Sequence, residues 1–181
     1  SDYRLQDGDM VRIPPLRLPE PEQSRPVPAA VFPVVFEDEH MMVIDKPAGV
    51  AVHGGSGVSF GVIEQLRAAR PQEPFLELAH RLDRDTSGLL IIAKRRAALV
   101  GLHDMFREIR ARKFYWALVQ GDWVNDRQHI RFPLLRWLTE SGERRVKVDP
   151  AGKPAHTIIT MQRRFGRFTL VQAELKTGRT H

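Results

Sequence analysis

The chain has 181 residues and no cysteine, which excludes disulfide bonds and thiolate metal ligands. It also lacks an apolar run of the roughly 18 to 20 residues that span a bilayer, and its first residues carry no signal-peptide pattern. A hydrophobic content of 42% beside 28% charged residues is typical of globular proteins. These features predict a globular, cytoplasmic protein that makes no membrane contact.

Glycine-rich nucleotide-binding loops are missing as well. Gly55 and Gly57 are followed by Phe60 where a dinucleotide-binding motif needs its third glycine, and no Walker lysine follows. The same glycines do not complete the nucleophile elbow of serine hydrolases. We therefore expect no nucleotide cofactor and no serine-hydrolase chemistry. The neighbouring His53 is interpreted as a loop or substrate-contact residue and not as a catalytic base.

Positive charge is the most informative feature of the composition. The chain carries 28 Lys and Arg against 22 Asp and Glu, for a net charge of +6, and 22 of the basic residues are arginines. Basic clusters recur along the whole chain, at Arg67/Arg70, Arg95/Arg96, Arg107/Arg110/Arg112, Arg144/Arg145 and Arg163/Arg164/Arg167. The planar guanidinium pairs with phosphate and stacks on bases. This distribution favours a folded surface for nucleic acid, with an ordinary solvated surface as the alternative.

Three regions follow one another along the chain. Residues 1–13 contain a short turn and strand that are too small to fold alone. Residues 14–33 hold seven of the 13 prolines and indicate an extended, semi-rigid linker. The hydrophobic pattern becomes dense from residue 34 onward, so residues 34–181 are predicted to form the main domain.

Hydrophobic periodicity in the main domain predicts short-looped strands with two helices inserted. A hairpin is expected at 34–36 and 41–44, and a helix over 59–70 with Ser59 as its N-cap. The apolar face of a second helix includes Leu99, Leu102, Phe106 and Ile109. Further strands are expected at 89–93, 114–119, 144–148, 157–161 and 168–175. This pattern favours an α+β fold with a mixed, mainly antiparallel sheet core and a few helices.

One polar loop, residues 80–88, places Asp83 between two arginines just before the apolar run 89–93. Turn-forming residues that lead into a buried strand would explain such a loop without any function. A calcium loop begins with the same spacing of Asp83, Asp85 and Ser87, but Lys94 occupies the twelfth position, where that loop needs a bidentate glutamate. The repeated carboxylates alone therefore predict no metal site.

Four segments of the chain resemble, in the same order, the motifs of the RluA-type pseudouridine synthases, enzymes that isomerise uridine in structured RNA. These segments are Lys46-Pro47-Ala48-Gly49, the loop His80–Gly88, the strand Lys113–Val119 and the terminal Leu175–His181. The resemblance implies a pseudouridine synthase catalytic fold over residues 34–181, incomplete at its C-terminal end, and large-subunit ribosomal RNA as the substrate. It also implies that residues 1–13 are the remnant of a small S4-like RNA-binding domain.

The same resemblance implies roles for individual side chains. Asp83 is implied to be the nucleophile, Arg179 its ion-pair partner, and Tyr115 the ring that stacks on the target uracil and whose hydroxyl helps remove the C5 proton. Trp116, on the opposite face of the same strand, is interpreted as a core residue. Arg81, His80 and Arg84 are the implied RNA-binding and base-flipping residues. Thr86, Ser87 and Gly88 are expected to hold the turn of the loop.

The chemistry implied by this family explains the residue types. Pseudouridine forms when the bond from uracil N1 to ribose C1′ breaks and the base rejoins through C5, without redox change, so no cofactor is expected. A carboxylate nucleophile can attack C1′ or C6, or assist elimination at the sugar, once the base has left the RNA stack. The leading hypothesis is a monomeric RNA pseudouridine synthase. A basic RNA-binding module without catalysis, and a divalent-ion phosphoryl enzyme that uses Asp83 and Asp85, are the alternatives.

Overall fold

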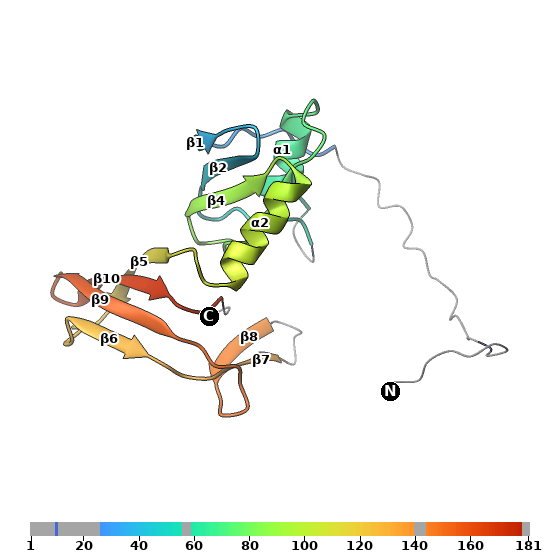
Figure 1. Ribbon diagram of the computed structural model, residues 1–181. Helices are drawn as coiled ribbons and strands as arrows, with labels where there is room; N and C mark the ends of the chain where they lie inside the picture. The colour runs from blue at the N-terminus through green and yellow to red at the C-terminus, as the bar shows by residue number, and fades with distance from the viewer. Residues whose placement is uncertain (1–9, 11–25, 56–58, 140–143, 179–181) are drawn as a thin grey trace.

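The computed structural model describes residue 10 and residues 26–55, 59–139 and 144–178 (Figure 1). Two four-stranded sheets and a two-stranded hairpin account for the strands of these ranges, and every strand pairing is antiparallel. The predicted α+β fold with a mainly antiparallel core is therefore confirmed. The predicted S4-like remnant and the greater part of the predicted linker lie outside the described residues.

The first sheet carries the N-terminal half of the described chain. Its strands are β1 (Val34–Glu37), β2 (Met41–Lys46), β3 (Glu77–Leu78) and β4 (Gly88–Ala93), in the order β1-β2-β4-β3. The turn between β1 and β2 is closed by the Asp38 carboxylate, which accepts hydrogen bonds from the backbone N–H of His40 and of Met41, each at 2.8 Å. The predicted hairpin is confirmed, whereas β3 was not anticipated because two residues carry no periodic signal.

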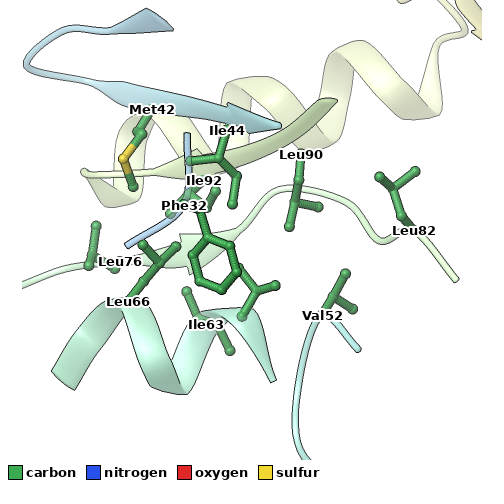
Figure 2. Packing of buried hydrophobic residues seen from close by; sticks show 11 residues of the cluster. Phe32, Met42, Ile44, Val52, Ile63, Leu66, Leu76, Leu82, Leu90 and Ile92 are labelled. Atoms are coloured by element: carbon green, nitrogen blue, oxygen red, sulfur yellow. The ribbon is translucent and has the colours of Figure 1, made fainter. Parts of the chain in front are cut away.

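Helix α1 (Val62–Ala69) packs against one face of this sheet and closes the main core. Figure 2 shows Ile63 and Leu66 of the helix facing Met42, Ile44 and the other apolar residues of the strands. Phe32, from the last residues of the predicted linker, is also part of this core and is buried there. The segment just before β1 therefore contributes to the packing of the domain.

The start of α1 differs from the prediction, because Gly61 is the N-cap and Ser59 is not. The Glu64 carboxylate accepts hydrogen bonds from the backbone N–H of Gly61 at 2.8 Å and of Gly54 at 3.1 Å. A Cβ at residue 61 would lie 2.4 Å from backbone atoms of His53, so only glycine fits this approach. Glu64 thus replaces the serine cap and ties the loop 51–55 to the helix.

Helix α2 (Arg96–Arg107) leads from the first sheet toward the second (Figure 1). It was predicted from its apolar spacing, although Ile109 lies beyond its end and has a positive φ of 59°. At eight and 12 residues, the two helices of the described ranges lack the length and apolar character needed to cross a membrane.

The second sheet consists of β5 (Lys113–Gln120), β6 (Arg127–Ile130), β9 (Thr157–Arg164) and β10 (Phe168–Leu175), in the order β5-β10-β9-β6. A separate hairpin pairs β7 (Leu134–Leu138) with β8 (Arg144–Val148). The predicted strands at 114–119, 144–148, 157–161 and 168–175 are confirmed. Strands β6 and β7 were missed because their sequences, Arg-Gln-His-Ile and Leu-Leu-Arg-Trp-Leu, do not alternate between apolar and polar residues.

Strand β5 has two faces of unlike exposure. Tyr115 points to the half-buried face and packs against the main core, whereas Phe114, Trp116 and Leu118 point the other way. The interpretation of Trp116 as a core residue is wrong for the described structure, because its side chain is 62% exposed. The alternation of side chains along a strand places it on the face that the described elements leave open.

A cluster of ion pairs fastens β1 to the end of α1 and to β4. Glu37 accepts a 2.6 Å hydrogen bond from Arg70 and a 2.8 Å hydrogen bond from Lys94. These two partners, in that order, lower the pKa of Glu37 from 4.5 to about 2, against the opposing effect of burial. The folded state therefore prefers the ionised carboxylate, and its stability contribution is present above pH 4.5 and lost as the pH falls toward 2.

Replacing Glu37 with glutamine should therefore destabilise the protein at pH 7 but not near pH 2. The pKa difference of Glu37 between the unfolded and folded states corresponds to about 3 kcal/mol of stability at pH 7. Partial exposure of the ion pairs reduces this contribution to about 1 to 2 kcal/mol. Urea unfolding of wild type and Glu37→Gln at several pH values measures the difference. Glu39→Gln is the matched control, since Glu39 and its partner Arg95 are both largely exposed. A difference that stays constant between pH 7 and pH 2.5 would contradict this assignment.

Candidate active site

A cleft of about 550 Å³ lies where the first sheet, α2 and the second sheet meet. The loop after β3 supplies Asp83, β5 supplies Tyr115, and Gly178 follows the end of β10. The lining residues are Ala79, His80, Arg81, Leu82, Asp83, Thr86, Phe106, Arg107, Lys113, Tyr115, Arg136, Leu175 and Gly178. Segments that are far apart in the sequence, and that contain three of the four predicted motifs, therefore converge on one concave site.

Asp83 is presented to solvent at the mouth of this cleft, with its side chain 59% exposed. The backbone carbonyl of Asp83 accepts a 3.1 Å hydrogen bond from the N–H of Thr86, which closes a tight turn. The nearest cation within the described residues is Arg81, whose Nη2 lies 4.0 Å from Asp83 Oδ1. An accessible carboxylate on a fixed turn is suited to act as a nucleophile.

Two other charged residues of the loop pair with each other. Arg84 pairs with Asp85 at 3.1 Å, and both side chains are exposed. Arg84 and Arg81 also line a shallower cavity of about 220 Å³ beside His53. In the described ranges, no three carboxylate or imidazole groups come close enough to share one metal ion. Asp83 and Asp85 thus do not form a shared cluster with further acidic or histidine ligands.

Lys46, at the end of β2, is the internal support of this loop. Its side chain is 0% exposed, and its ammonium donates hydrogen bonds to the backbone carbonyls of Pro47 at 2.9 Å, Val50 at 2.8 Å and Arg84 at 3.0 Å. Burial lowers the pKa of Lys46, and the negative charges of Asp85 and Asp83 oppose that shift. The lysine therefore joins two loops through their backbones and places a buried cation behind the nucleophile candidate.

His80 fixes the beginning of the loop. The backbone N–H of Ile91 donates a 3.1 Å hydrogen bond to His80 Nε2, and the ring packs against Phe106 with centroids 5.2 Å apart. Burial lowers the pKa of His80, a backbone hydrogen bond with Arg81 opposes this shift, and the charge of Lys113 acts in the same direction as burial. The imidazole is therefore neutral and accepts at Nε2, so in this structure it anchors the loop to β4 while one edge faces the cleft.

Tyr115 faces the cleft from the second sheet. Burial raises its pKa, and the nearby negative charge of Asp83 raises it further. The phenol therefore stays protonated at neutral pH and can donate or relay a proton, but it does not act as a preformed phenolate. Tyr115 was predicted to lie in a strand, and it does lie in β5. The structure also brings it into the same cleft as Asp83.

The remaining predicted residues differ in position. Thr86 lines the cleft, Ser87 is exposed at the outside of the turn, and Gly88 begins β4 with φ of 120°, a conformation that favours glycine. Arg179 lies outside the described residues, although Gly178 before it borders the cleft. Sequence reasoning gave no site role to Phe106, Arg107, Lys113 or Arg136, which reach the cleft from α2, β5 and β7. Phe106 had been predicted only as part of an apolar helix face, Arg107 only as part of a basic cluster, and Lys113 only as the first residue of a strand motif.

Comparisons with known proteins identify relatives of this chain. A model of the RNA pseudouridylate synthase family matches residues 40–181. Ribosomal large subunit pseudouridine synthase C of Yersinia pestis is 50% identical over 99% of this chain and 58% of its own length. The protein of the same name from Escherichia coli K12 is 49% identical with the same coverage. The chain thus spans 58% of the length of these relatives.

Two human structures share the fold. Human RNA Pseudouridylate Synthase Domain Containing 1 superimposes with a TM-score of 0.70 at 25% identity, covering 83% of this chain and 62% of that one. Human RNA Pseudouridylate Synthase Domain Containing 4 gives a TM-score of 0.67 at 21% identity, covering 82% and 60%. The family match includes the second sheet, every strand of the first sheet except β1, and the segments that carry Asp83 and Tyr115. This chain belongs to the RNA pseudouridylate synthase family.

Proposed function

We propose that the protein containing this chain is a cofactor-independent RNA pseudouridine synthase that modifies uridines of large-subunit ribosomal RNA. The observation that carries the proposal is the meeting of Asp83 and Tyr115 in one solvent-open cleft with Arg81 at its mouth. The ribosomal substrate is supported by relatives that are about half identical and are named for the large ribosomal subunit. We further propose that the enzyme works in the cytoplasm as a monomer.

In the proposed mechanism, the target uridine leaves the RNA stack and enters the cleft. Arg81 fills the space that the base leaves, where its guanidinium stacks on the neighbouring bases. The uracil ring stacks on Tyr115, which places the base beside the Asp83 carboxylate. Extrusion costs a few kcal/mol, and contacts of this kind offset it.

Asp83 then acts on the nucleotide by attacking ribose C1′ or uracil C6, or by assisting elimination at the sugar. The N1 to C1′ bond breaks, the uracil rotates, and a bond from C5 to C1′ forms; any bond that Asp83 made to the nucleotide breaks, which restores its free carboxylate. The proton on C5 leaves with help from the hydroxyl of Tyr115, and N1 gains a proton, so atoms balance without redox change. Arg179 is proposed to pair with Asp83 and keep its carboxylate ionised as the base covers it.

The direct test uses the full chain, meaning this sequence together with any residues that flank it in the natural protein. Large-subunit ribosomal RNA transcribed with tritium at uridine C5 serves as substrate, and released tritium is counted with and without EDTA. Release that is insensitive to EDTA supports the proposal. Tight RNA binding without release would favour a non-catalytic RNA-binding module, and release that requires a divalent ion would favour metal-dependent chemistry.

Replacing Tyr115 with phenylalanine should separate stacking from proton removal. The ring remains, so RNA affinity should change less than twofold, whereas loss of the hydroxyl should lower kcat for tritium release by roughly 100-fold. Tyr115→Ala removes the stacking surface as well and should also weaken RNA binding by about 1 to 3 kcal/mol. Single-turnover kinetics and filter binding measure the two quantities. Equal kcat in Tyr115→Phe and wild type would exclude a role for the hydroxyl.

A further inference from the structure

A second cavity, of about 490 Å³, lies beside the cleft under the β7–β8 hairpin. It shares Arg136 and Gly178 with the cleft that holds Asp83. Its volume falls within the range of about 300 to 1,000 Å³ that is usual for small-ligand sites. Apart from Gly178, the residues that line this cavity belong to no predicted motif, and the proposed mechanism does not use the cavity.

The walls of this hairpin cavity are held by backbone contacts. Leu134 and Lys153 exchange both backbone hydrogen bonds, at 2.9 and 3.0 Å, so the turn after β8 folds back onto β7. A Cβ at Gly152 would lie 2.5 Å from the carbonyl carbon of Leu134, so glycine is required at this approach. The Asp149 carboxylate accepts a 3.0 Å hydrogen bond from the N–H of Ala151 and closes the turn. These contacts fix the backbone that forms the walls of the cavity.

The lining combines an apolar wall with two cations. Leu134, Leu135 and Val146 supply apolar surface, and Val146 lies directly across the hairpin from Arg136. Lys153 is exposed at the edge, and within the described residues no carboxylate oxygen lies within 4.0 Å of its ammonium. Apolar surface next to a cation suits a nucleotide, because the base packs on the wall and the phosphate pairs with the ammonium.

The position of the cavity indicates which nucleotide it receives. A uridine flipped into the cleft remains joined to its neighbours through the RNA backbone, so an adjacent nucleotide must lie close to the mouth of the cleft. We propose that the hairpin cavity binds the base of a nucleotide adjacent to the target uridine, with Lys153 contacting its phosphate. This inference rests on the proposed function and assigns a second subsite to the same RNA.

The test combines changes in the cavity with changes in the RNA. A stem-loop that carries the target uridine is prepared intact and with an abasic site at either neighbour, and its affinity for the full chain is measured. One abasic substitution should weaken binding to wild type by about 5- to 100-fold. Val146→Phe places a larger ring in the cavity wall and obstructs the position of the base. This variant should bind intact RNA as weakly as wild type binds the abasic RNA, and the abasic site should cause it no further loss.

Lys153→Gln provides a second variant that lies on the surface and does not disturb packing. It should reduce the slope of log affinity against log salt by about 0.7 to 0.9, as expected for one lost phosphate contact. The matched controls are Val148→Phe, two residues along β8 and outside the cavity lining, and Arg127→Gln, exposed at the start of β6. Both controls should lose as much affinity on abasic RNA as wild type does. Arg127→Gln should also keep the wild-type salt slope and leave tritium release unchanged.

Two outcomes distinguish failure of this inference from failure of the proposed function. The subsite is wrong if wild type binds RNA and releases tritium but binds both abasic RNAs as tightly as intact RNA. It is also wrong if Val146→Phe still loses affinity when the RNA is made abasic. If wild type releases no tritium from intact RNA, the proposed function fails and this subsite falls with it. Thermal unfolding of each variant confirms that the comparison is made between folded proteins.

Discussion

Replacing Asp83 with asparagine should lower kcat for tritium release by about 10⁴-fold or more, the scale seen when a catalytic nucleophile is removed. Asparagine has nearly the same shape, but its amide cannot form the covalent or charge-stabilised intermediate that a carboxylate provides. The side chain of Asp83 is exposed and makes only a 4.0 Å contact with Arg81, so its replacement should leave the fold intact. The measurement is single-turnover release at saturating enzyme.

Two further observations make that result specific. RNA affinity of Asp83→Asn should remain within a few fold of wild type, because the loss concerns the reaction and not uniform binding. Asp85→Asn is the matched control, since Asp85 lies on the same loop, is exposed and pairs with Arg84. Its kcat should stay within about tenfold of wild type on this reasoning. Comparable losses in both variants would indicate that loop structure, and not one carboxylate, determines activity.

Replacing Lys46 with methionine should lower the free energy of unfolding by about 2 to 4 kcal/mol, because buried carbonyl groups are left without donors. Methionine preserves the apolar stem, so the change isolates the ammonium group. The carbonyls of Pro47, Val50 and Arg84 lose their shared partner in a site from which water is excluded. Urea unfolding of both proteins at pH 7 measures the difference.

The same substitution should also reduce activity in the fraction of protein that is folded. The contact to the Arg84 carbonyl adjoins Asp83, so its loss should let the loop move and lower kcat/KM by roughly 100-fold, as small displacements of a catalytic group do. Lys147→Met is the control, because Lys147 is half-exposed and pairs with Asp149 at the surface. Its stability should change by about 0.5 kcal/mol or less. A Lys46→Met protein as stable and active as the control would refute the supporting role.

The elements that could be predicted from the sequence are those whose local pattern and final burial agree. The apolar spacing in α1 matches a face that the fold buries, and the apolar spacing in α2 matches a half-buried face. Strands β5 and β10 were predicted from their apolar runs. The association of Asp83 with Tyr115 came from ordered motifs of a family and not from periodicity. The structure adds that the charge of Asp83 acts on Tyr115 across the cleft.

Other features depend on contacts that a linear pattern does not contain. Ser59 has the chemistry of an N-cap, but Glu64 already satisfies the helix start through the N–H of Gly61. Trp116 has the size of a core residue, yet its strand position turns it to the open face. The role of Lys46 depends on the carbonyl of Arg84, 38 residues away in the sequence. Such partners are fixed only when the chain has folded.

The walls of the cleft belong to two sheets with separate strand pairings, one carrying Asp83 and the other Tyr115. A ligand that fills the cleft touches both, so its binding free energy is added to the stability of each sheet and to their mutual placement. Opening of either sheet destroys the site and releases the ligand. An RNA bound in the cleft, as proposed, should therefore make the two sheets unfold as a single cooperative unit, even where their own packing would let one open before the other.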